Sequence, residues 1–137
     1  MIRQLFQDAP STNRPITNRR IPMSFKVSER YNCVVIEFKG NVMGGPDAVN
    51  LNEKLHELIE KGKNNIVVDL GKVGFMNSSG LGMLIGALTT MRKAGGDLRI
   101  ANATDKIESL LVITKLITVF KHYKSLDKAV ESYEEGK

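Results

Sequence analysis

Cysteine, tryptophan and long apolar runs are scarce or absent in this chain of 137 residues, and each absence excludes a class of protein. The single cysteine, Cys33, rules out a disulfide within the chain and a metal site built from several cysteines. It lies in an apolar run, which predicts a buried thiol. No apolar run approaches the roughly 20 residues that span a bilayer. Tryptophan is absent and aromatic residues make up only 6%, so large stacking surfaces for bases are not expected.

Positive charge is concentrated at the N-terminus. Residues 1–22 contain four arginines and one aspartate, which leaves only +2 of the total charge of +5 for residues 23–137. A folded domain with so small an excess gives no reason to expect direct binding of nucleic acid. Pro10, Pro15 and Pro22 punctuate residues 1–22, which lack sustained periodicity, so we expect a flexible extension followed by one domain. No apolar segment follows Arg19-Arg20, and we therefore expect a cytoplasmic protein.

The hydrophobic pattern alternates between strand-like and helix-like periods. It predicts strands over 25–27, 33–38, 65–70, 97–101 and 118–123. Helices are expected over 46–61 and 79–94, then from 104 or 105, and from 126 after a cap at Ser125, with Gly62 ending the first. Asn65 to Leu70 is a near-continuous apolar run, typical of a central strand. The order β-β-α-β-α-β-α-β-α predicts an α/β sheet with right-handed crossovers.

Helical spacing also predicts which side chains face the core. Gly82 and Gly86, one turn apart, are expected to allow a close contact between helix and sheet. The core-facing positions that we expect are Val49, Leu55, Leu58 and Ile59 in the first helix, Leu81, Leu84, Ile85, Leu88 and Met91 in the second, Ile107, Leu110, Leu111 and Ile113 in the third, and Leu126, Ala129, Val130 and Tyr133 in the fourth.

The most informative stretch is Asn77-Ser78-Ser79-Gly80-Leu81-Gly82, where a glycine-punctuated turn over 71–77 leads into the second helix. The start of a helix has unsatisfied backbone N–H groups and a partial positive charge, which favour polar caps and anions. A serine there is well placed to carry a phosphate. The alternative is that Ser78 and Ser79 serve only as helix caps.

The same stretch has few of the features that an enzyme active site requires. It lacks the G-x-S-x-G pattern of a nucleophile elbow, and the two histidines, His56 and His122, have no evident orienting acid. No Walker-type phosphate loop occurs, and no group of residues has the spacing of a metal site. A cofactor or metal is therefore not expected. A hydrolase that uses Ser78 or Ser79 as nucleophile remains as a minor alternative.

The run F-M-N-S-S-G-L-G, preceded by I-V-V-D-L, closely resembles the signature of the STAS family, specifically the bacterial anti-sigma factor antagonists. The resemblance continues through G-G-D-L-R-I-A-N, I-T-K-L and F-K-H-Y and covers about residues 24–133. It implies a STAS-like mixed β-sheet with about four helices in a single domain, residues 23–137.

The resemblance also implies a switch rather than an enzyme. In that family a serine-kinase anti-sigma factor phosphorylates the first serine of the pair, which here is Ser78. The unmodified antagonist binds the anti-sigma factor, the phosphorylated form releases it, and a PPM-type phosphatase resets the cycle. The expected switch loop is Asn77, Ser78, Ser79, Gly80, Leu81 and Gly82, with Ser79 capping the helix. No contact with nucleic acid or membrane is implied.

One position departs from the family pattern. Residue 77 is Asn where the usual residue is Asp, so a negative charge beside the phosphoacceptor is missing. An amide can still shape the turn. The loss of charge leaves open a second hypothesis, a STAS scaffold that binds partners in a signalling assembly without being phosphorylated.

Overall fold

The computed structural model describes residues 23–135. Residues 1–22, for which the sequence predicts a flexible extension, lie outside this range, as do the last two. The described chain forms five strands and four helices in the predicted alternating order.

The sheet is mixed, with the strands in sequence order. They are β1 (Ser24–Glu29), β2 (Val34–Val42), β3 (Asn65–Met76), β4 (Asp97–Ala101) and β5 (Lys121–Tyr123). β1 is antiparallel to β2, so these two strands form a hairpin, and every other pair of neighbours is parallel. β3 therefore has two strands on each side, which confirms the central position predicted from its apolar run.

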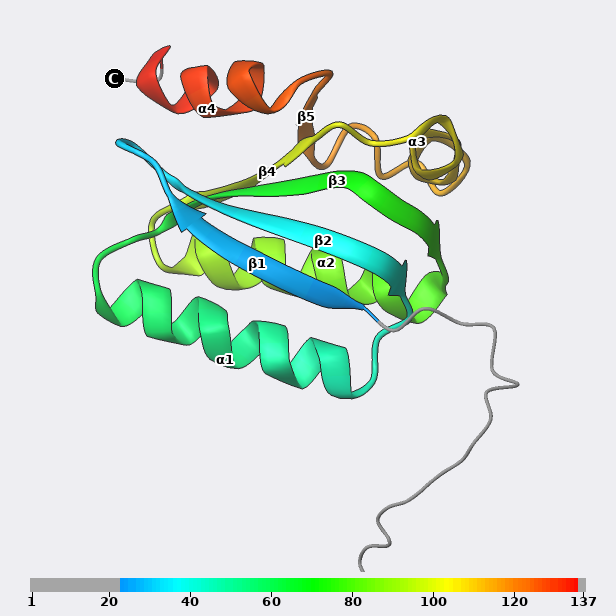
Figure 1. Ribbon diagram of the computed structural model, residues 1–137, viewed down its shortest axis with the longest axis horizontal. Coiled ribbons are helices and arrows are strands. Elements are labelled where there is room, and N and C mark those ends of the chain that lie inside the picture. The colour runs from blue at the N-terminus through cyan, green and yellow to red at the C-terminus, as the bar shows by residue number, and fades with distance from the viewer. Residues whose placement is uncertain (1–22, 136–137) are drawn as a thin grey trace, which may run out of the picture.

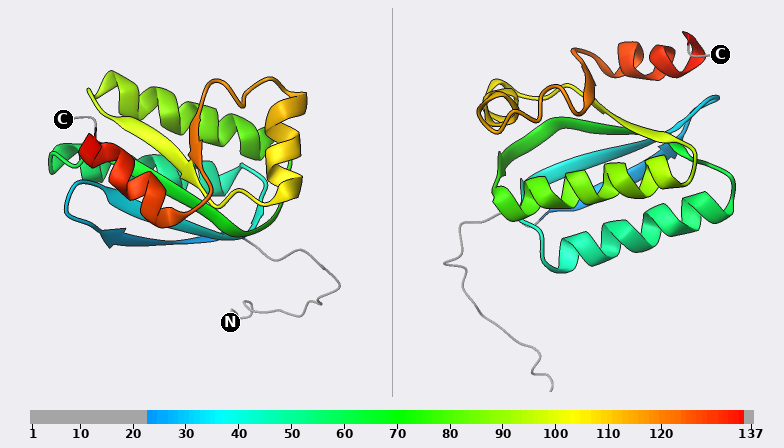
Figure 2. Two further views of the ribbon diagram at one scale, coloured as in Figure 1. Left: turned by 90° about the horizontal axis from the view of Figure 1, so that it is seen from above. Right: turned by 180° about the vertical axis from the view of Figure 1, so that it is seen from behind.

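The helices cover the two faces unequally. Figures 1 and 2 show α1 (Pro46–Glu60) and α2 (Ser78–Lys93) side by side under one face, with α4 (Leu126–Glu135) over the other. α3 (Asp105–Ile113) lies near the end of β3. The fold is thus a single α/β domain with a mixed five-stranded sheet and four helices within the described residues, as the sequence predicted.

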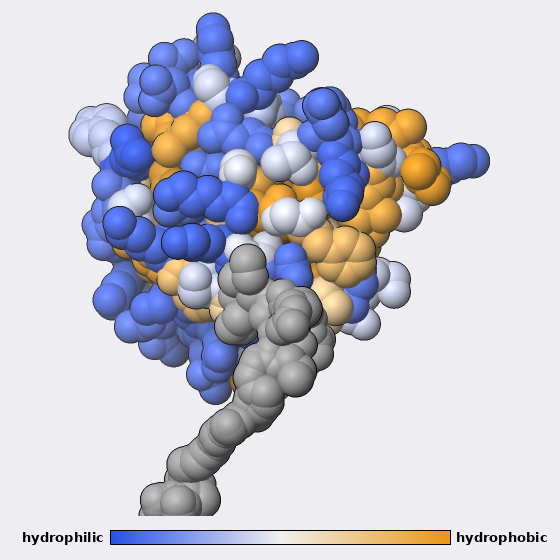
Figure 3. Space-filling model, turned by 45° about the vertical axis from the view of Figure 1, so that its right-hand side comes forward, coloured by the Kyte–Doolittle hydropathy of each residue, from blue (hydrophilic) through white to orange (hydrophobic). Residues whose placement is uncertain are grey.

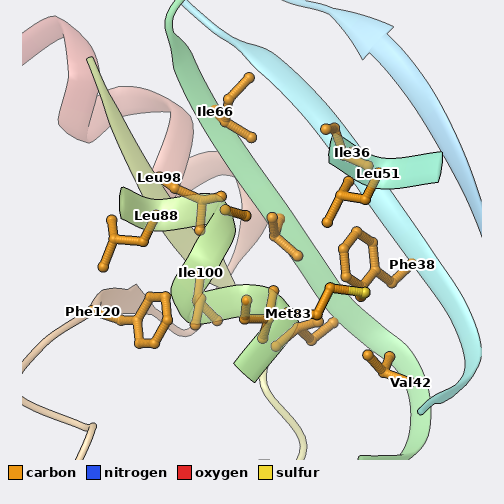
Figure 4. Close-up of a cluster of buried hydrophobic side chains, with 14 of the residues drawn as sticks. Ile36, Phe38, Val42, Leu51, Ile66, Met83, Leu88, Leu98, Ile100 and Phe120 are labelled. Carbon is orange, nitrogen blue, oxygen red and sulfur yellow. The ribbon is translucent and has the colours of Figure 1, made fainter. Parts of the chain in front are cut away.

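The core is divided by the sheet into a large and a small cluster. Leu84 and Leu88 of α2 are buried in the large one. Figure 4 shows Leu88 there together with Ile36, Phe38, Leu98 and Ile100 of the strands. In the small one, Ala129 and Tyr133 of α4 pack on Cys33, Val35 and Val67. Successive residues of β3 alternate between the clusters, which explains why its apolar run is nearly continuous. The buried Cys33 confirms the prediction for its thiol.

Three strands are longer than predicted. β1, expected over 25–27, spans Ser24–Glu29. The segment 71–77, expected as a turn, continues β3 as far as Met76. It does so because β2 also continues, beyond Gly40 to Val42, and pairs with it through two register shifts that end in the pair Val42 and Met76. β5 is shorter than predicted and begins at Lys121.

Two predicted core positions are wrong for a shared reason. Val49 is 57% exposed and Ile113 is 77% exposed. Each lies two residues, or about 200°, from a buried leucine of its own helix, Leu51 in α1 and Leu111 in α3. Tertiary packing selects the leucine in each case, and the β-branched residue faces outward.

Candidate functional site: the serine turn

One residue, Asn77, joins β3 to α2, and it organises the serine turn (residues 77–80). Its side-chain Oδ1 accepts a hydrogen bond from the Gly80 N–H at 2.7 Å, which makes it the N-cap of α2. Its backbone N–H donates to the Val42 carbonyl at 3.2 Å, and its own carbonyl accepts from Leu81 at 2.9 Å. The turn is therefore held to both the helix and the neighbouring strand.

Two glycines allow this close approach. A Cβ on Gly80 would lie 2.0 Å from the Val42 carbonyl oxygen, so no larger residue fits without moving the backbone. A Cβ on Gly44 would lie 2.9 Å from the Ser79 Cβ, and Gly44 also has a φ of +83°. The loop that follows β2 is thus packed directly against the first turn of α2.

The two serine hydroxyls are left free by this arrangement. Ser78 and Ser79 are both exposed, and neither side chain has a hydrogen-bond partner within residues 23–135. The prediction that Ser79 caps the helix is wrong, because α2 already begins at Ser78 with Asn77 as its N-cap, and the Ser79 hydroxyl bonds no backbone N–H within the described residues. The first turn of α2 contains no acidic residue, so the helix supplies no counter-charge of its own at its positive end.

The glycines of α2 face a groove rather than the sheet. Gly82 and Gly86 are exposed, and a Cβ added to either would meet no atom within 4 Å. Both line a groove between α1 and α2 that also includes Ser79 and Gly44. The predicted close contact between these glycines and the sheet is therefore absent.

A second surface feature beside the turn escaped the sequence analysis. Phe75, at the end of β3, is 43% exposed and lines an apolar groove with Met76, Ile107, Leu110 and Ile113. The groove measures about 500 Å³, and the exposed residues Asp105 and Lys106 also line it. The signal was present in the sequence, because Val112 and Ile113 extend the apolar run of α3 beyond what one helix face can bury.

Asp69 was also missed as a structural residue. It is buried, and its carboxylate accepts from the Gly71 N–H at 2.9 Å and from the Asn102 amide at 3.2 Å. Asn102 has a φ of +60°, so this bond holds an unusual backbone conformation where β4 ends. The pair ties β3 to β4 on the side of the sheet that leads to the serine turn.

Catalytic partners for the serines are missing from the described part of the chain. His56 lies on α1, where its Nδ1 is 2.9 Å from the Asn52 carbonyl oxygen, and His122 lies on β5. Among residues 23–135, no three His, Cys, Asp or Glu side chains converge as metal ligands. None of the helices described is both long and apolar enough to cross a membrane.

The comparison with protein families agrees with this architecture. The model of the STAS domain matches residues 24–129, which is most of the chain and includes the whole serine turn. The chain belongs to the STAS domain family. The resemblance seen in the F-M-N-S-S-G-L-G run is thereby confirmed.

Similar proteins carry a consistent description. The anti-sigma-B factor antagonist of Bacillus subtilis is 34% identical over 79 residues, 56% of this chain and 72% of the relative. A putative anti-sigma factor antagonist of Thermotoga neapolitana is 28% identical over 78 residues, 57% of this chain and 69% of the relative. Unphosphorylated SpoIIAA, an anti-sigma factor antagonist, superposes with a TM-score of 0.68 at 17% identity, covering 82% of this chain and 97% of that one. The phosphorylated form of SpoIIAA superposes with a TM-score of 0.62 at 18% identity. The match covers 80% of this chain and 98% of that one.

Proposed function

We propose that this STAS domain is an anti-sigma factor antagonist, a cytoplasmic switch that binds an anti-sigma factor of the serine-kinase type while Ser78 is unmodified. Phosphorylation of Ser78 by that partner releases it, and a PPM-type phosphatase restores the binding form. The names of the similar proteins support the antagonist role. No catalytic role is assigned to the serines, since no base contacts them in the described structure.

One observation carries the proposal that a serine of this turn is modified: Asn77, and not a serine, caps α2. A hydroxyl that caps a helix cannot be modified without loss of that bond, whereas the Ser78 hydroxyl is exposed and unbonded. A phosphate there adds about −1.5 to −2 charges and three acceptor oxygens. The helix N-terminus tolerates this charge within the domain, but a partner that covers the turn would meet added bulk and an unpaired charge.

The resemblance to the family selects Ser78 over Ser79, and the position of Ser79 supports that choice. Ser79 faces the groove between α1 and α2, where its Cβ lies against Gly44. A group attached to Ser79 therefore has to share that space with the loop after β2. Ser78 does not line this groove.

The decisive experiment measures phosphate incorporation from ATP with the cognate kinase, located by mass spectrometry. We expect incorporation in the wild type and in Ser79→Ala, and none in Ser78→Ala. Ser78→Asp is expected to fold and to bind the anti-sigma factor more weakly, with a partial effect because a carboxylate has less charge than a phosphate. Incorporation that persists in Ser78→Ala and is lost in Ser79→Ala contradicts the assignment.

The scaffold hypothesis is tested by the same assay, because Asn77 lacks the negative charge that the family pattern has there. If binding to the partner is retained and no kinase modifies the wild type, the domain is a constitutive binding module. A faster reaction in Asn77→Asp at unchanged stability shows that the missing carboxylate tunes the switch.

A further inference from the structure

The apolar groove of Phe75, Met76, Ile107, Leu110 and Ile113 has no cover within the described residues. Phe75 and Ile113 stay 43% and 77% exposed, although both are large apolar side chains. Figure 3, which brings the right-hand side of Figure 1 forward, shows apolar surface gathered at this end of the molecule. Exposed apolar surface of this kind usually marks a contact site.

The described chain begins beside this groove. Ser24, the first residue of β1, pairs with Lys39 on β2, and two residues further along β2, Asn41 pairs with Phe75. With strands about 4.8 Å apart and a rise of about 3.3 Å per residue, Ser24 and Phe75 are separated by about 12 Å. The 22 residues that precede Met23 therefore enter the domain at the end of the sheet that carries the groove.

The first residues of the chain carry a matching pattern. Ile2, Leu5 and Phe6 stand at i, i+3 and i+4, the sequence spacing at which apolar side chains share one face of a helix. This spacing is the one that a short segment uses when it binds an apolar groove. Arg3 lies within the same segment of the sequence, and Asp105 is an acidic residue among those that line the groove.

The connecting length suits such a contact. Sixteen residues separate Phe6 from Met23. A chain of that length without regular structure spans about 20–25 Å on average, so it covers the 12 Å with slack and keeps the effective concentration of the segment high.

We propose that residues 2–6 of this chain dock into the apolar groove between the end of β3 and α3, beside the serine turn. Phe75 is two residues from Asn77, so the docked segment covers surface next to Ser78. If the proposed antagonist function holds, the anti-sigma factor has to displace this segment, which then acts as a built-in competitor. The docking itself does not depend on that function.

Disulfide trapping in the isolated chain of 137 residues tests the docking. All variants carry Cys33→Ala, so that only introduced thiols react. The test pair is Gln4→Cys with Ser109→Cys, which leaves the three apolar side chains of the segment intact and uses an exposed residue at the groove. The control pair combines Gln4→Cys with Tyr31→Cys; Tyr31 is 94% exposed at the other end of β2.

Under mild oxidation we expect the test pair to form an intramolecular disulfide at least about 10-fold faster than the control pair, because docking raises the local concentration of the two thiols. Adding Leu5→Asp and Phe6→Asp to the test pair is expected to reduce its rate at least about 10-fold. An unchanged rate overturns the proposal, because the proximity of the tether alone then accounts for the difference from the control. Equal rates for the two pairs overturn the proposal. Disulfide-linked dimers in place of the intramolecular product also overturn it and identify a second copy of the chain as the occupant. No outcome involves the anti-sigma factor, so failure here leaves the proposed function untouched.

Discussion

The α4 face of the sheet and the serine turn both have polar side chains near β3. Under α4 these side chains are hydrogen-bonded to the protein, whereas the serines of the turn are not. Under α4, the Tyr133 hydroxyl donates to the Ile66 carbonyl at 2.7 Å, and the Arg99 guanidinium stacks 4.0 Å from the Tyr133 ring centre. Arg99 also donates to the Ser132 hydroxyl at 2.7 Å. Burial raises the pKa of the Tyr133 phenol, so it stays a neutral donor.

Asp97 is the acidic partner of Arg99. Burial by itself raises the pKa of Asp97, but hydrogen bonds from the Leu98 N–H, Arg99 and Arg92 outweigh it and hold the pKa below the usual range. The carboxylate is therefore charged and paired, with Arg92 and Arg99 each at 3.2 Å.

At the serine turn the backbone is bonded and the side-chain hydroxyls are not. The single polar side chain that serves the fold there is Asn77, while Ser78 and Ser79 stay open to solvent. The contrast separates polar groups that stabilise the fold from those that are available for modification. A buried polar group needs a hydrogen-bond partner, whereas an exposed hydroxyl without one can be modified without loss of such a bond. Three substitutions sharpen this contrast, and the largest effect is expected at the backbone of the turn.

Gly80→Ala is expected to lower the free energy of unfolding by about 3 kcal/mol, because the new Cβ overlaps the Val42 carbonyl oxygen and the backbone has to shift. Gly82→Ala is the matched control in the same helix. Its Cβ meets no atom, and alanine favours a helix over glycine by about 0.8–1 kcal/mol, so this variant should be slightly more stable. Urea denaturation measures the free energy of unfolding of both variants. Similar values for the two variants contradict the close approach of β2 and α2.

Tyr133→Phe is expected to cost about 1–2 kcal/mol, because it removes a buried hydrogen bond and leaves the Ile66 carbonyl without this donor. Tyr31→Phe removes the same hydroxyl from a residue that is 94% exposed, and it should change stability by less than about 0.5 kcal/mol. Thermal and chemical denaturation of the pair compare the two hydroxyls directly. If Tyr31→Phe costs as much as Tyr133→Phe, the bond to Ile66 is not what holds α4.

Ser78→Ala is expected to have the smallest effect, within about 0.5 kcal/mol of the wild type, because no bond is lost within the described structure. Asn77→Ala is the reference variant, because loss of the N-cap is expected to lower the free energy of unfolding by about 1 kcal/mol. The comparison requires only denaturation curves for the unmodified proteins. A larger cost for Ser78→Ala than for Asn77→Ala shows that the hydroxyl serves the fold after all.

Much of this fold is encoded locally, and the sequence alone was enough to predict it. The order of strands and helices follows from periodicity, and the phase of α2 was correct, with Leu84 and Leu88 buried. Gly62 follows α1 with a φ of +78°, as expected of a residue that ends a helix. The run around Ser78 pointed to the STAS family without any structure. These features depend on neighbours within about one helical turn.

Other features depend on residues that are distant in the sequence, and only the tertiary structure determines these. The end of β3 is a strand only because β2 extends to pair with it, and no local pattern in 71–76 shows that. The choice between Asn77 and Ser79 as cap depends on where the Val42 carbonyl holds the turn, since three neighbouring residues can all cap a helix. Packing likewise turned Val49 and Ile113 outward in favour of adjacent leucines. Local sequence limits each choice to a few options, and the free energy of burial and pairing across the sheet selects among them.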